Sequence, residues 1–143
     1  MYLEHANVTV PSIEANVRFL STALPEFREL GGGPLFGNAK LGRWIHFGTD
    51  DTYIAFTELK DPAGLSDGDY QTAGVKHLGF VVDDVHAVIE RCRAAGYEPT
   101  DASAMGSHPF QKRVYFADGC GPGWEFVEYL SDKKSEQHDY KLR

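Results

Sequence analysis

The chain has 143 residues, 42% hydrophobic and 24% charged, which is typical of one globular domain with a core of its own. Its net charge of −7 argues against nucleic acid or an anionic membrane as a partner, because either would need a basic face. No apolar run approaches the ~20 residues that span a bilayer, and the first residues do not resemble a signal peptide. With only Cys92 and Cys120, no disulfide framework is expected. We expect a cytoplasmic protein.

The first predicted elements are a strand and a helix. The run HANVTV, residues 5–10, is rich in β-branched residues, as strands are. Ser12 follows as a candidate N-cap, and Ile13, Val17 and Leu20 then form an apolar stripe at helical spacing. The glycine-rich segment GGGPLFGNAKLG, residues 31–42, is expected to be a loop. Residues 43–59 read as strands that turn at Asp50 and Asp51.

A second copy of this pattern begins at residue 75. When His77 is aligned with His5, HLGFVV falls on HANVTV and Asp84 falls on Ser12 as a second candidate N-cap. Gly96 is placed to end the second helix. The apolar stripe of that helix consists of Val85, Ile89 and Cys92.

The later parts of the two copies also match. Residues 54–56 fall on 124–126, which aligns Glu58 with Glu128, and Arg43 falls on Arg113. The two arginines are candidates to bind an anionic substrate or, alternatively, solvated strand ends. The sequence therefore predicts two βαβββ modules at about 1–59 and 75–130, a linker over 60–74 and a polar tail over 131–143.

A module of this size cannot bury its sheet alone, so the two sheets are expected to pair. The predicted fold is α+β, with a curled mixed sheet around a cleft. His5 and His77 occupy the same position on the first strand of each module, which predicts that they meet in the cleft. A single strand histidine is more often structural than a ligand, but two at repeat-equivalent positions favour a metal site.

This layout resembles the vicinal oxygen chelate superfamily, which includes glyoxalase I, extradiol dioxygenases, fosfomycin-resistance proteins and bleomycin-binding proteins. The resemblance rests on EHANVTV, KHLGFVVDD and DGCGPGWEFVEYL and covers the chain to Leu130. It implies one divalent ion (Fe, Mn, Zn or Ni) held by His5, His77 and Glu125. It also implies a small-molecule substrate and a homodimer, within which the modules pair in one chain or across two.

Two imidazoles and one carboxylate form a set of ligands suited to Fe, Mn, Zn or Ni. The isomerases of this superfamily add a fourth ligand on the last strand of the first module. The internal alignment places Ala55 at that position, and alanine cannot bind a metal. Glu58 replaces it only if the strand register slips, because residues three apart face opposite sides of a sheet.

The segment GSHPFQKRVYFADGCGPGWE also resembles the extradiol ring-cleavage signature, with Gly119 where that signature has proline. The resemblance implies that His108 and Tyr115 orient the substrate, whereas a core aromatic is the plain alternative for Tyr115. We therefore expect a metal-dependent enzyme, with extradiol dioxygenase-like chemistry favoured. The alternatives are a glyoxalase I-like lyase or isomerase, a fosfomycin-type transferase, and a non-catalytic binding protein of the bleomycin-resistance kind.

Overall fold

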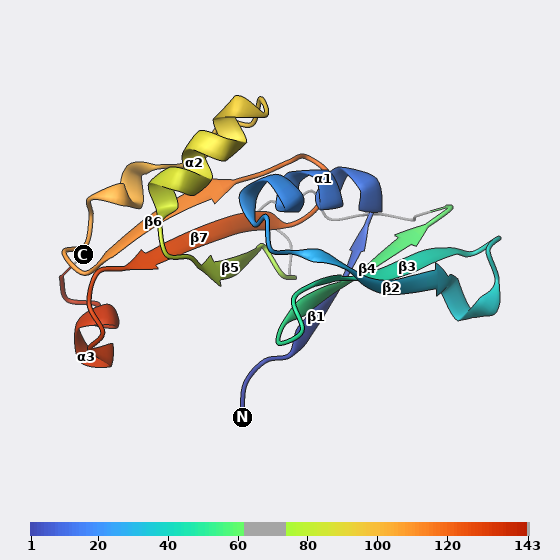
Figure 1. Ribbon diagram of the computed structural model, residues 1–143, viewed down its shortest axis with the longest axis horizontal. Coiled ribbons are helices and arrows are strands. Elements are labelled where there is room, and N and C mark those ends of the chain that lie inside the picture. Colours follow the sequence, from blue (N-terminus) through green and yellow to red (C-terminus); the bar gives the residue numbers. More distant parts are fainter. Residues whose placement is uncertain (62–73, 143) are drawn as a thin grey trace. The chain divides into compact units, whose positions relative to one another are not determined.

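The computed structural model describes residues 1–61 and 74–142, which form two compact units (Figure 1). Of these residues, the first unit takes 1–61 and 118–121, and the second takes 74–117 and 122–142. The linker expected over 60–74 lies outside the described residues except at its ends. Within the described part of the chain, no helix has the length and apolar character needed to cross a membrane.

The first unit is a four-stranded sheet with one helix. Its strands lie in the order β1-β4-β3-β2, with β1 parallel to β4 and the other neighbours antiparallel. The elements are β1 (His5–Val10), α1 (Ile13–Ala23), β2 (Arg28–Pro34), a 3₁₀ turn (Leu35–Gly37), β3 (Gly42–Gly48) and β4 (Tyr53–Leu59). This unit has the predicted βαβββ order.

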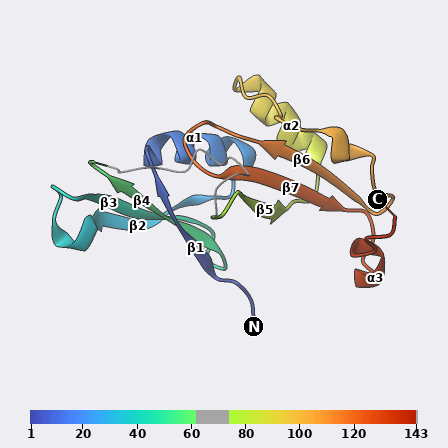
Figure 2. The same ribbon diagram turned by 180° about the vertical axis from the view of Figure 1, so that it is seen from behind.

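The second unit has a smaller sheet in the order β5-β7-β6, which Figure 2 shows from behind. Its elements are β5 (His77–Val81), α2 (Val85–Ala94), a 3₁₀ turn (Ser103–Met105), β6 (Gln111–Phe116), β7 (Gly123–Tyr129) and α3 (Lys134–Gln137). As in the first unit, the first strand lies parallel to the last.

The prediction of three strands after the second helix is wrong by one strand. Among the described residues, the counterpart of β2 is reduced to an isolated bridge between Asp101 and Tyr115. The segment before β6 contains Pro99, Pro109 and several turn-forming residues, which have low strand propensity. The prediction of a loop over residues 31–42 is also partly wrong, because residues 31–34 pair with β3.

Glycine in β2 has a steric reason at one position. A Cβ added to Gly32 would lie 2.6 Å from the Trp44 carbonyl oxygen and 2.8 Å from Ile45 Cγ2. Close approach of the two strands therefore requires glycine there, and pairing with β3 outweighs the low strand propensity of glycine. The glycine-rich sequence by itself does not predict this strand, because the strand depends on its pairing with β3.

Helices α1 and α2 begin as the sequence predicts. The Ser12 hydroxyl accepts a hydrogen bond from the Ala15 amide at 3.2 Å, and the Asp84 carboxylate accepts one from the Ala87 amide at 3.1 Å. Both caps satisfy amide groups that the first helical turn leaves without partners. Gly96 follows the end of α2 with φ +89°, a left-handed conformation that glycine adopts without strain.

A carboxylate from β4 holds the start of α1. Glu58 Oε2 accepts a hydrogen bond from the Ile13 amide at 2.6 Å, and Glu58 Oε1 accepts one from Arg43 Nε at 3.1 Å. Partial burial raises the pKa of Glu58, but the hydrogen bonds from Arg43 and Ile13 outweigh it, so the pKa lies below its usual value. Glu58 is therefore a charged structural link between strand and helix.

The second unit repeats this link. Glu128 Oε2 accepts a hydrogen bond from the Val85 amide at 3.1 Å, and Glu128 Oε1 accepts one from Lys112 Nζ at 3.0 Å. The structural counterpart of Arg43 is therefore Lys112. The sequence alignment of Arg43 with Arg113 was wrong by one residue.

These links fix which face of each sheet its helix covers. Because side chains alternate along a strand, the residues on the same face as Glu58 and Glu128 pack beneath α1 and α2. The buried apolar side chains of the first unit include Val10, Ile13, Phe19, Leu20, Ile45, Phe47, Ile54 and Phe56. Those of the second include Val85, Val88, Ile89, Cys92, Val114, Phe116, Trp124 and Phe126. We call the opposite face of each sheet, which the helix does not cover, its open face.

We expect Glu58→Gln to lower the free energy of unfolding at pH 7 by about 1–3 kcal/mol, because a charged acceptor is lost from Arg43 and from the helix amide. The pKa of Glu58 is lowered on folding, so this stabilisation is present at neutral pH and is lost as the pH falls through the folded-state pKa. Urea unfolding of both proteins at pH 7 and pH 3 measures the difference. Glu14→Gln, on the exposed side of α1, is the control, and equal loss in both variants would contradict the assignment.

Candidate functional site

The candidate site in the second unit lies on the open face of β5, β7 and β6. Glu128 points toward α2, so Glu125, three residues earlier on β7, faces the other side. Its neighbours across the sheet are Gly79 on β5 and Tyr115 on β6. His77 lies two residues before Gly79, on the same face.

Three of the predicted site residues meet there. The Tyr115 hydroxyl donates a hydrogen bond to Glu125 Oε1 at 2.6 Å, and His77 Nε2 lies 3.2 Å from Glu125 Oε2. The His77 and Tyr115 rings make an edge contact with centroids 5.8 Å apart. The Glu125 side chain is only 13% exposed, whereas His77 is 37% exposed. Tyr115 thus fixes one carboxylate oxygen while the other faces the imidazole.

The spacing of His77 and Glu125 suits a metal ion. Two ligands held about 2.1 Å from one ion at octahedral or tetrahedral angles lie roughly 3.0–3.4 Å apart. The observed 3.2 Å between Nε2 and Oε2 falls in this range. The spacing of this pair is therefore compatible with a shared divalent ion, and it is also that of a hydrogen-bonded imidazole and carboxylate.

Sequence reasoning missed Gly79. A Cβ at this position would lie 3.4 Å from Glu125 Oε2 and 4.0 Å from Glu125 Cβ. A larger side chain would cover the carboxylate oxygen that faces His77. The signal was present in the sequence as a glycine inside a strand, which often marks a close approach by another group.

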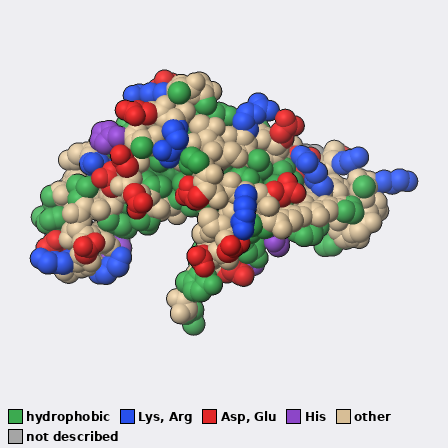
Figure 3. Space-filling model, viewed as in Figure 1, with side chains coloured by type: hydrophobic (Ala, Val, Ile, Leu, Met, Phe, Trp, Pro, Cys, Tyr) green, Lys and Arg blue, Asp and Glu red, His purple; other side chains and the backbone are tan. Residues whose placement is uncertain are grey.

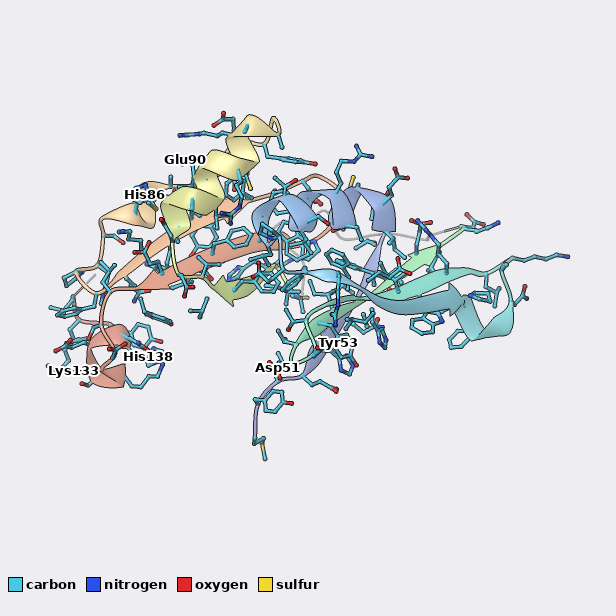
Figure 4. The ribbon with its side chains drawn as sticks, in the orientation of Figure 1. Asp51, Tyr53, His86, Glu90, Lys133 and His138 are labelled. Carbon is cyan, nitrogen blue, oxygen red and sulfur yellow. The ribbon has the colours of Figure 1, made fainter. Side chains whose placement is uncertain are left out.

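His5 lies at the matching position of the first unit, on the open face of β1. Its ring stacks on Tyr53 at a centroid distance of 4.8 Å and an interplanar angle of 9°. His5 Nδ1 lies 3.0 Å from Glu4 Oε2. His46 also stacks on Tyr53 at 4.5 Å and lies 6.4 Å from the His5 ring, and Trp44 lies 4.8 Å from His46. Figure 4 labels Tyr53, at the start of β4.

This cluster of four rings was not predicted as a unit. Its spacing follows from the pairing of Gly48 with Tyr53 and of His46 with Ala55, which places alternate residues of β3 and β4 on one face. His46 is the counterpart of Tyr115, because Tyr115 pairs with Glu125 as His46 pairs with Ala55. The two open faces therefore share a fold but carry different chemistry.

The strand register answers the question of a fourth ligand in the first unit. Ala55 pairs with Asn7 as Glu125 pairs with Gly79, so Ala55 is the counterpart of Glu125. Glu58 points to the opposite face, where it binds Arg43 and the start of α1. The register has not slipped, and Glu58 is not available as a ligand on the face of His5.

His108 lies apart from this group of contacts. It is 4% exposed, its Nε2 lies 3.0 Å from the Asp139 carbonyl oxygen, and its Nδ1 accepts a hydrogen bond from the Phe110 amide at 3.1 Å. Both ring nitrogens are thus engaged by the backbone. Gln111 Nε2 adds a hydrogen bond to the Gln137 carbonyl oxygen at 3.1 Å. These contacts favour a structural role for His108 in holding the C-terminal segment, which the sequence did not indicate.

Other histidines are peripheral. His86 on α2 and His138 after α3 are both exposed (Figure 4). Within residues 1–61 and 74–142, no three His, Cys, Asp or Glu side chains are grouped closely enough to hold a metal ion. On the face shown in Figure 3, basic side chains are interspersed with acidic ones.

Comparison with known proteins is consistent with this fold. Residues 2–126 match the family model described as the Glyoxalase/Bleomycin resistance protein/Dioxygenase superfamily. The chain belongs to this superfamily. Curated proteins give no match to the chain.

Solved structures of the superfamily share the fold at low sequence identity. A glyoxylase/bleomycin resistance protein/dioxygenase domain from Frankia sp. EAN1pec has 21% identity and a TM-score of 0.69, with 96% of this chain and 98% of that chain covered. A mutant of the fosfomycin resistance protein FosX from Listeria monocytogenes has 17% identity, a TM-score of 0.68 and coverage of 95% and 97%. That structure is a complex with Mn(II) and 1S,2S-dihydroxypropylphosphonic acid. At these identities the likeness shows the fold alone.

For this superfamily member, we expect His108→Phe to lower stability and loosen the C-terminal segment without changing metal affinity. The reason is that both ring nitrogens bond to backbone groups of the second unit. Limited proteolysis after residue 130, together with titration of Mn(II), measures the two effects. His86→Phe is the matched control on an exposed helix position. A loss of metal affinity at unchanged protease resistance would show that His108 acts at the site.

Proposed function

We propose that this chain is a metal-dependent enzyme that acts on a small substrate with two neighbouring oxygen atoms. His77 and Glu125 supply two ligands of one divalent ion, and His5 supplies the third. The observation that carries the proposal is the 3.2 Å spacing of His77 Nε2 and Glu125 Oε2, with the other oxygen of Glu125 held by Tyr115.

The ligand set favours Mn(II), Fe(II), Zn(II) or Ni(II), because two imidazoles and one carboxylate suit all four ions. The Mn(II) in FosX from Listeria monocytogenes supports this choice as a precedent within the fold. When bound, the ion would act as a Lewis acid toward the substrate oxygens.

The surrounding residues have definable tasks in this proposal. The Tyr115 hydroxyl orients the Glu125 carboxylate, as second-layer hydrogen bonds to metal ligands commonly do. The Glu4 carboxylate is bonded to His5 Nδ1, which leaves Nε2 of that ring to face an ion. Ala55 contributes no ligand, so positions on the ion remain for the substrate.

The reaction class follows from what the site retains. An isomerase of the glyoxalase I kind needs a fourth protein ligand, and Ala55 counts against it. Ring cleavage of the extradiol kind is supported by Tyr115 but has lost the support of His108, whose nitrogens bond to the backbone. A site with three protein ligands also suits chemistry of the fosfomycin-resistance kind, and the proposed ligands His5, His77 and Glu125 supply that number. We place this reaction class first and ring cleavage second.

A non-catalytic binding role is the rival from another class. Such a protein needs no metal ligands, whereas the spacing of His77 and Glu125 suits an ion. Homodimer formation and residence in the cytoplasm stay predictions.

The test combines metal and substrate. Protein purified without an affinity tag is stripped with a chelator, reloaded with each ion and assayed on fosfomycin with water or a thiol, on catechols under oxygen, and on methylglyoxal hemithioacetal. We expect turnover with one of these substrates that needs the ion and falls at least about 100-fold in Glu125→Ala, since a lost metal ligand removes the Lewis acid.

His86→Ala is the control for the removal of a histidine, and it is expected to keep both the ion and the activity. Turnover that survives the chelator and Glu125→Ala would contradict a metal-dependent enzyme. Binding of these compounds with no turnover under any ion would favour the binding protein.

A further inference from the structure

Arg113 is a half-buried cation on the open face of the second unit. Lys112 and Val114 point toward α2, so Arg113 points the other way, as Tyr115 does two residues along β6. Its neighbour on β7 is Val127, which is 9% exposed. Arg113 therefore shares the face of Tyr115 and Glu125.

This arginine lacks a charge partner in the described part of the chain. Its Nε is buried and has no hydrogen-bond partner there. Other arginines form ion pairs with carboxylates: Arg18 with Glu14, Arg28 with Asp50, Arg43 with Glu58 and Arg93 with Glu98. Lys112, the adjacent cation on β6, is paired with Glu128.

A buried donor of a charged group is costly to leave without an acceptor, so its presence calls for an explanation. If Arg113 had a structural role, we would expect the chain itself to provide an acceptor for it, as Glu58 does for Arg43. Val127 offers no acceptor side chain to Arg113. An oxyanion from outside the chain would satisfy the guanidinium, which binds carboxylate and phosphoryl oxygens through paired N–H groups.

The position is also specific to the second unit. Trp44 pairs with Thr57 as Arg113 pairs with Val127, so an aromatic ring occupies the equivalent site in the first unit. The cation is therefore not a feature that the repeated fold requires. It distinguishes the open face that carries Glu125 and His77.

We propose that Arg113 binds an anionic group of the substrate, which makes the substrate class a small oxyanion such as a carboxylate, phosphate or phosphonate. This inference rests on the proposed function, which supplies the two neighbouring oxygen atoms of the same substrate. Residues two apart on a strand are roughly 6.6 Å apart, so the anionic group lies only a few bonds from the oxygens held near Tyr115 and Glu125.

The test measures oxyanion binding apart from metal binding. Inorganic phosphate, methylphosphonate and malonate are titrated by calorimetry into wild type, Arg113→Met, Arg113→Lys and the control Arg18→Met, each with chelator and with Mn(II). We expect at least one of these anions to bind wild type and Arg18→Met equally. Affinity should fall at least tenfold in Arg113→Met and by less in Arg113→Lys, which keeps the charge but not the paired donors.

Circular dichroism checks that each variant is folded, and Arg113→Lys serves as the test if Arg113→Met is not. Absence of binding to wild type, or equal binding by wild type and the Arg113 variant, would overturn the inference. Mn(II) affinity, followed by electron paramagnetic resonance, distinguishes the two proposals. Arg113-dependent oxyanion binding without any Mn(II) binding would sustain the inference while the proposed function failed.

Discussion

The structure depends on one interaction that occurs twice, the hydrogen bond from the first amide of a helix to a glutamate on the last strand of the same unit. Glu58 holds the start of α1, and Glu128 holds the start of α2. Because side chains alternate along a strand, each link also decides which residues face away from the helix. Glu125 must then lie on the open face of the second unit, and Ala55 must lie on that of the first.

The same constraint explains how two similar units come to differ in chemistry. Each open face has a histidine at the start of its first strand, but the residues beside it have diverged. In the second unit the histidine faces a carboxylate that Tyr115 holds by a hydrogen bond, and Arg113 lies two residues before Tyr115 on the same strand. In the first unit the histidine belongs to a cluster of aromatic rings, and an alanine, Ala55, occupies the position of the carboxylate. A repeated backbone thus supplies equivalent positions, and the side chains at those positions divide the tasks.

Much of this arrangement could be predicted from the sequence. Ser12, Asp84 and Gly96 act through local hydrogen bonds and backbone conformation, so they could be read from their neighbours alone. The equivalence of Ala55 and Glu125 followed from aligning the two copies, because the repeat fixes the strand register. These predictions needed no knowledge of distant contacts.

The remainder depended on contacts between distant residues. Residues 31–34 form a strand because β3 pairs with them, and the partner of His108 lies 31 residues along the chain. Arg113 was aligned one residue out of register, because the turn before β7 and the turn before β4 differ in length. Its lack of a partner became visible only when Lys112 was seen to bind Glu128.

The central proposal is that His77 and Glu125 bind one metal ion and that His5 supplies its third protein ligand. It is tested most directly by a crystal structure of the protein grown with Mn(II), with the ion located by its anomalous scattering. We expect a single strong peak within about 2.0–2.3 Å of His77 Nε2, Glu125 Oε2 and a His5 ring nitrogen, while Tyr115 still bonds to the other oxygen of Glu125. A structure in which the ion lies elsewhere, and His77 and Glu125 still face each other without it, would contradict the proposal.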